Sequence, residues 1–166
     1  MANKVWIVGS SLVHWAECRA NRDSSKWTML TSQKVSWHGQ RGMKWNQLIP
    51  KVKTLLQKDL PPHKLLIHLG GNYLVTTHLG KLTKQAQSDV RALAMLCPKT
   101  VLLWSDVLPR IRYRGAKAHN KVEKTRKTFK FIHESLCEKN GWKVGETPPN
   151  TMVYESAISI RWSALE

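Results

Sequence analysis

Long hydrophobic runs and cysteines are both scarce in this sequence. The longest apolar runs, such as residues 101–104, have strand length, so no membrane span is expected. The first apolar run is broken at Gly9, too early for a secretory signal peptide. The 3 cysteines are an odd number without metal-ligand spacing, which argues against a disulfide framework and a zinc site. These absences predict a protein of a reducing intracellular compartment, cytoplasmic or nuclear, and indicate no metal and no cofactor.

Acidic residues are also scarce, and the chain is therefore strongly basic. Lys and Arg number 27 against 11 Asp and Glu, a formal net charge of +16. A potential of this size favours nucleic acid, other polyanions or anionic surfaces as partners. Residues 110–130 concentrate the charge, with Glu123 as the single acid. The candidate contacts are Arg110, Arg112, Arg114, Lys117, Lys121, Lys124, Arg126 and Lys127. A solvated helix face plus a basic loop explains the same run equally well, and no dedicated nucleic-acid motif is present.

The 166 residues suit one domain, and their hydrophobic pattern alternates between strand and helix. The strand-like segments are residues 4–9, 35–38, 64–69 and 100–105, and residues 142–144 could begin a fifth strand. The helix-like segments are residues 11–20, 43–56, 79–96 and 116–139. Pro50 either kinks the second helix or delays its start. This order predicts an α/β fold, a three-layer α/β/α sandwich with a parallel sheet of flavodoxin-like type.

Polar candidates follow three of the expected strands, at the carboxyl edge where such sheets form their sites. Ser11 follows the first strand on a tight turn near the positive end of a helix, although serine is also a common helix N-cap. Gly39 follows the second strand and lets the backbone approach a ligand closely. Asn72 follows the third strand and offers an amide donor. A nucleophile with oxyanion donors is what acyl-transfer chemistry needs.

Three blocks in this order resemble those of the SGNH (GDSL-like) hydrolase family. They are residues 8–12, 37–42 and 68–73, and residues 104–110 resemble the segment after the family's fourth strand. The resemblance covers residues 4–142, which are also similar to the SGNH-type domains of vertebrate retroelement open reading frames. It implies an SGNH-type domain over residues 1–143 and a small ester substrate. It also implies Ser11 as the nucleophile, with Gly39 and Asn72 in the oxyanion hole.

The sequence also departs from the family pattern. Ser10 replaces the Asp of the first block, and Tyr73 replaces the last Asp of the third. The late Asp-x-x-His block is missing, because no Asp follows Asp106 and no His follows His133. Residues 144–166 read as a divergent tail, either disordered or truncated. A serine without a base is a poor nucleophile near neutral pH, so we expect impaired or absent catalysis.

Three histidines are candidates for a substitute base. His14 shares a helix face with Ser11, while His38 and His68 lie near the ends of the second and third strands. A structural role, as a loop donor for His38 and as a packed strand residue for His68, explains them as well. Asp106 either orients a site histidine or caps the following loop. The sequence leaves open an SGNH-type ester hydrolase, a non-catalytic basic binding module and a copy that folds poorly, and it does not predict the oligomeric state.

Overall fold

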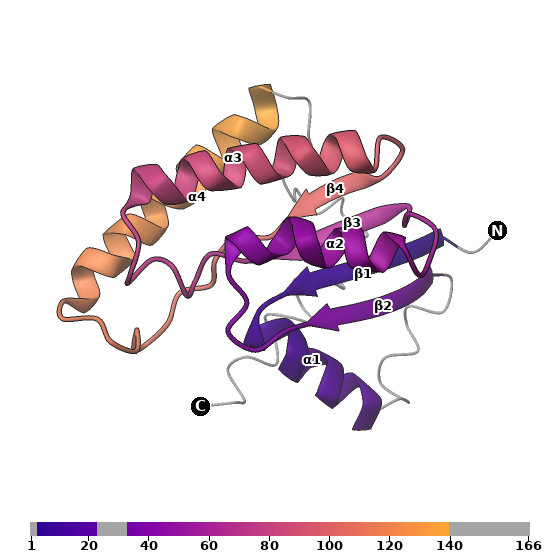
Figure 1. The fold of residues 1–166 in the computed structure, drawn as a ribbon. Coiled ribbons are helices and arrows are strands. Elements are labelled where there is room, and N and C mark those ends of the chain that lie inside the picture. The colour runs from indigo at the N-terminus through magenta and orange to yellow at the C-terminus, as the bar shows by residue number, and fades with distance from the viewer. Residues whose placement is uncertain (1–2, 23–32, 140–166) are drawn as a thin grey trace.

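Four parallel strands form the centre of the fold (Figure 1). A computed structural model describes residues 3–22 and 33–139. The strands are β1 Asn3–Gly9, β2 Gln33–Gly39, β3 Lys64–His68 and β4 Val101–Trp104, in the spatial order β2-β1-β3-β4. The predicted α/β fold with a parallel sheet is confirmed. The expected strand at residues 142–144, the domain boundary at residue 143 and the tail 144–166 lie outside the described residues.

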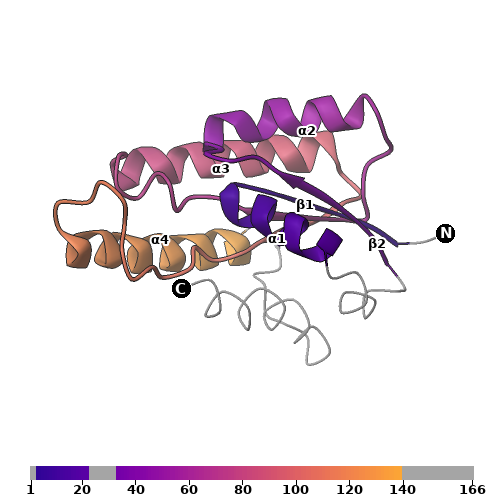
Figure 2. The same cartoon turned by 90° about the horizontal axis from the view of Figure 1, so that it is seen from below.

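Helices cover the sheet on both sides. They are α1 Ser11–Arg22, the short 3-10 helix η3 Trp45–Gln47, α2 Leu48–Leu56, α3 Leu79–Leu96 and α4 His119–Lys139. Figure 2 shows α2 and α3 on one side of the sheet and α1 and α4 on the other. The helix expected over residues 43–56 begins late because Pro50 lies in the first turn of α2, where its missing N–H needs no partner. None of the helices in residues 3–22 and 33–139 combines the length and apolar character needed to cross a membrane.

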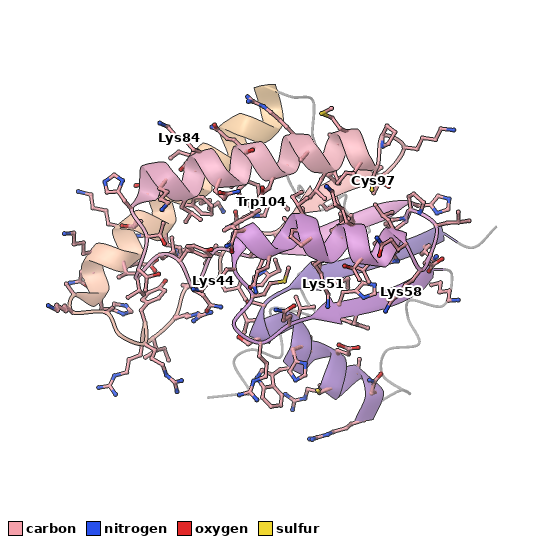
Figure 3. All side chains as sticks on the ribbon, in the orientation of Figure 1. Lys44, Lys51, Lys58, Lys84, Cys97 and Trp104 are labelled. Atoms are coloured by element: carbon pink, nitrogen blue, oxygen red, sulfur yellow. The ribbon has the colours of Figure 1, made fainter. Side chains whose placement is uncertain are left out.

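The larger core lies between the sheet and the α2–α3 layer. Alternate residues of the two central strands point into it, since successive side chains of a strand face opposite ways. These side chains are Trp6, Val8, Leu65 and Ile67, all at most 1% exposed. Trp104 of β4 joins them below α3 in Figure 3 and packs edge-on against Trp45 and Phe129, with ring centroids 5.1 and 5.5 Å apart. This packing fixes η3, which carries Trp45, and α4, which carries Phe129, relative to the end of β4.

A smaller core lies under α1. Val5 and Ile7 of β1 bury their side chains against Val13 of α1. Central β1 is therefore covered on both faces, as its continuous apolar sequence requires. The contact also packs the first turns of α1 against the sheet.

The parallel register brings the carboxyl ends of all four strands to one edge. Gly9 is the register partner of both Gly39 and His68, and Ile67 is the partner of Trp104. The segments that follow these residues therefore leave the sheet side by side, at the edge where the sequence places the candidate site.

Candidate active site

The turn from β1 into α1 gives two neighbouring serines, Ser10 and Ser11, different structural roles. The Ser10 carbonyl accepts the His14 N–H at 3.2 Å, the first bond of the helix, so Ser10 occupies the N-cap position. Ser10 is 6% exposed, and its N–H donates to the His68 carbonyl at 3.4 Å. Ser11 is the first residue of α1 and is half-buried. Since Ser10 is the cap, the Ser11 hydroxyl is left available at the positive end of the helix.

Two glycines bring the start of α1 directly onto the strand ends. A Cβ on Gly39 would lie 2.2 Å from the backbone nitrogen of His14. A Cβ on Gly9 would lie 2.5 Å from Val13 Cγ2 and 2.6 Å from the His68 carbonyl oxygen. No side chain fits at either position, so glycine is required by close approach. The Gly39 backbone therefore lies against the first turns of the helix that begins with Ser11.

The turn after β3 carries Asn72. Gly70 adopts a φ of 121°, and a Cβ there would lie 2.9 Å from Val107 Cγ2, so the sharp turn depends on glycine. The Tyr73 N–H closes the turn on the Gly70 carbonyl at 2.9 Å. Asn72 is half-buried, and in residues 3–22 and 33–139 its side-chain amide makes no hydrogen bond. That amide is therefore free to donate to a ligand at the carboxyl edge.

His68 ends β3 with its imidazole held in place by Ser105. Nδ1 of His68 and Oγ of Ser105 lie 2.5 Å apart in a hydrogen bond. Burial, with a smaller contribution from the charge of Arg110, lowers the pKa of His68 to about 4, so the ring is neutral near pH 7. The sequence interpretation missed Ser105 as a partner. Aligning β4 on β3 could have found it, because the register places Ser105 directly beside His68.

A small cleft opens at this edge of the sheet. Its walls come from the start of α1, the end of β3 and the segment after β4, and they consist of Ser10, Leu12, His68, Leu69, Gly71, Val107, Leu108 and Arg110. The walls combine a hydroxyl residue, a neutral imidazole and a guanidinium with several apolar side chains. The described part of the chain contains no cluster of three His, Cys, Asp or Glu residues that could hold a metal ion. The cleft encloses about 10 Å³, so it has room for about one water-sized polar group beside the hydroxyl, the imidazole and the guanidinium.

The other two histidine candidates face elsewhere. His14 Nε2 lies 3.8 Å from Cys18 Sγ, one turn further along α1, so the ring is turned away from Ser11. His38 packs edge-on against Trp6 at 5.4 Å, and its buried Nε2 has no partner among the described residues. Burial, and to a smaller extent the charge of Lys51, lowers the pKa of His38. No imidazole is hydrogen-bonded to the Ser11 hydroxyl within the described ranges, and of the three candidates His68 alone lines the cleft.

Most cations of residues 110–130 fall into two groups, those that are exposed to solvent and those that are paired with other groups of the protein. Six cations are exposed, namely Arg112, Arg114, Lys117, Lys121, Lys124 and Lys127, and we call them the basic patch. Arg126 does not belong to it, contrary to the sequence expectation. Its guanidinium is held by the Glu123 carboxylate at 2.6–3.0 Å and by the Val107 carbonyl at 3.1 Å. Asp106 pairs with Lys130 at 2.8 Å.

Solved structures that share this architecture are named as ester hydrolases. A lipolytic protein of the G-D-S-L family from Veillonella parvula is 12% identical, with a TM-score of 0.62 over 85% of this chain and 75% of that one. A catalytic mutant of an acetylxylan esterase from Geobacillus stearothermophilus is 11% identical, with a TM-score of 0.63 over 90% and 78%. A GDSL-like lipase from Bacteroides thetaiotaomicron is 14% identical, with a TM-score of 0.60 over 86% and 67%. The fold is that of the SGNH/GDSL hydrolases.

No protein-family model and no curated protein sequence matches the chain. The likeness to SGNH/GDSL hydrolases is therefore one of fold, and the chemistry must be argued from the residues at the carboxyl edge.

Proposed function

We propose that the chain is an SGNH-type serine esterase-like domain that hydrolyses a small ester, such as an acetyl ester, through Ser11. The observation that supports the proposal is that Ser11 follows β1, Gly39 ends β2 and Asn72 follows β3, three aligned strands of an SGNH/GDSL-type fold. The esterase names of structures with the same fold support it. The closer relationship of residues 4–142 to SGNH-type domains of vertebrate retroelements is part of the same proposal.

In this proposal Ser11 Oγ attacks the ester carbonyl and the negative charge develops on the carbonyl oxygen. The N–H groups of Ser11 and Gly39 and the Asn72 amide donate to that oxyanion. Each such donor contributes about 3 kcal/mol to the transition state. The C–O bond then breaks, the alcohol leaves with a proton, and water hydrolyses the acyl-serine to release the acid.

The general base limits the rate in this proposal. The late Asp-x-x-His block is missing from the sequence. His68 is the substitute that lines the cleft, and its neutral ring can accept a proton. A base with a pKa of about 4 accepts protons weakly, because efficient bases have a pKa near the working pH. We therefore expect turnover that is lower by about 10²–10⁴-fold than with a well-matched base.

Replacing Ser11 with alanine tests the activity. We expect the wild-type protein to hydrolyse 4-nitrophenyl acetate slowly and S11A to show only the buffer rate, because no nucleophile remains. Release of 4-nitrophenolate at pH 7.5 is the measurement. S88A, which removes an exposed serine of α3, is the matched control and should keep the wild-type rate. Equal rates for wild type and S11A, with both proteins folded by circular dichroism, would remove the proposed function.

A second candidate is a non-catalytic module that binds nucleic acid on the same scaffold. The observation that favours it is the basic patch, whose six cations are exposed on the loop before α4 and on α4 itself. The single acid of residues 110–130, Glu123, is bound to Arg126 and Tyr113 and so does little to offset the patch. In this function Ser11 takes no part, so S11A binds as tightly as wild type.

A further inference from the structure

Arg110 differs from every other cation of the basic run. The basic patch faces solvent, and Arg126 and Lys130 are paired with Glu123 and Asp106. Arg110 is half-buried and lines the cleft. Within residues 3–22 and 33–139 its guanidinium has no carboxylate partner. A cation in a cleft without a counter-charge favours an anionic group on a ligand.

The neighbours of Arg110 place this charge close to the proposed reaction centre. A Cβ on Gly71, the residue before Asn72, would lie 3.1 Å from Arg110 Nη2. The same charge contributes to the lowered pKa of His68. Ser10, the residue before the proposed nucleophile, lines the same cleft. The guanidinium therefore lies beside the residue that precedes the proposed oxyanion donor, in the cleft that Ser10 and His68 also line.

The chemistry of the guanidinium defines the ligand class. Its planar fork of N–H donors matches the two oxygens of a carboxylate or phosphate. The amino end of α1, which opens on the same cleft, favours negative charge as well. Apolar walls such as Val107 and Leu108 leave these groups as the main determinants of ligand charge.

We propose that Arg110 makes the site selective for esters that carry a carboxylate or phosphate group close to the ester bond. This inference rests on the proposed function, since it names the substrate class of the same site. It separates Arg110 from the basic patch, because the guanidinium binds one small anion in the cleft and contributes little to contact with a polyanion.

The kinetic experiment compares 4-acetoxybenzoate with its uncharged methyl ester. We expect wild type to prefer the anionic ester in kcat/KM and R110Q to lower that preference by about tenfold or more, because one charge-assisted hydrogen bond is removed. R110K keeps the charge without the fork and should restore part of the preference. R91Q makes the same chemical change at an exposed position of α3 and should keep the wild-type ratio. An equal ratio in wild type and R110Q overturns the inference.

A binding experiment separates this inference from the proposed hydrolysis. In the S11A background, NMR titration at constant ionic strength measures the affinity for the same two probes. We expect weaker binding of 4-acetoxybenzoate in S11A/R110Q, with competition by acetate or by inorganic phosphate identifying the favoured anion. Loss of binding preference without any wild-type hydrolysis keeps the Arg110 inference and removes the esterase. Ser11-dependent hydrolysis with no charge preference in either experiment keeps the esterase and removes the inference.

Discussion

At the residue scale, one departure from the SGNH-like sequence pattern has a structural explanation. Ser10 stands where the SGNH pattern has Asp, and it occupies the N-cap of α1. Ser and Asp are both strongly preferred N-caps, so the exchange preserves the start of the helix. It removes a negative charge from a cleft that contains Arg110. The exchange therefore leaves the position of Ser11 intact and makes the cleft more favourable to anions.

His68 predicts a distinctive pH dependence of stability. Its pKa is lowered from 6.5 in the unfolded chain to about 4 in the fold, so the unfolded chain binds more protons between these values. Its contribution to stability is fully present above pH 6.5 and is lost as pH falls towards 4, a change of about 3 kcal/mol. We expect the free energy of unfolding by urea to fall over this window in wild type and less steeply in H68N.

The difference between wild type and H68N is the quantity to measure, because other groups titrate in both proteins. Glu123 has its pKa lowered to about 2, chiefly by the hydrogen bonds of Arg126, so its contribution is lost only below about pH 4.5. The stability advantage of wild type over H68N should therefore shrink between pH 7 and pH 4. An advantage that stays constant over that range would show that the buried imidazole does not titrate as described.

At the element scale, the apolar periodicity of the sequence was enough to predict the sheet and its helices. The sequence predicts a helix over residues 79–96, and these residues form α3 Leu79–Leu96. For residues 43–56 the sequence predicts a helix that Pro50 either kinks or delays, and the structure shows the delayed start, with a 3-10 turn before α2 and Pro50 in the first turn of α2. Hydrophobic spacing does not distinguish an irregular helix start from a regular one.

Contacts between elements could not be predicted from the sequence, because they depend on how the elements pack against one another. The hydrogen bond of His68 with Ser105 depends on the register of β4 against β3. The separation of Arg110 from the basic patch depends on how the segment after β4 folds over Gly71. Composition indicates how many cations exist, whereas only the packed structure shows which of them are paired.

Gly39 predicts how tightly α1 is joined to β2. In G39A the new methyl group would lie 2.2 Å from the His14 nitrogen, and the surrounding backbone of Val13 and His14 leaves it no room. We expect a loss of at least about 2 kcal/mol of stability, seen as a lower melting temperature by circular dichroism. G80A is the matched control, because a Cβ at Gly80 meets only the His78 ring at 3.5 Å and alanine favours the helix. A melting temperature for G39A at or above that of G80A would contradict the close contact.

At the scale of the whole molecule, the segment after β4 connects the two candidate functions. It lines the cleft with Val107 and Arg110 and then continues into the loop and helix that carry the basic patch. Arg126 of α4 donates a hydrogen bond to the Val107 carbonyl and so holds α4 against this segment. The net charge of +16 acts on both regions, since long-range attraction brings anionic ligands to the surface before either site selects among them. The net charge therefore does not distinguish the esterase from the nucleic-acid-binding function. The positions of the individual cations, in the cleft or on the basic patch, do distinguish them.

The salt dependence of binding tests the basic patch. For a single-stranded oligonucleotide measured by fluorescence anisotropy, log K should fall linearly with log salt, since each neutralised phosphate releases counterions. Replacing two cations of the patch, in K121Q/K124Q, should reduce the slope by about 1.4, that is, about 0.7 for each phosphate that is no longer neutralised. The double variant K53Q/K58Q removes the same charge from exposed positions on and just after α2 and should leave the slope near the wild-type value.

Equal slopes for the two double variants would mean that the electrostatic field of the whole molecule, and not the basic patch, binds the polyanion. An affinity independent of salt would remove the nucleic-acid candidate altogether.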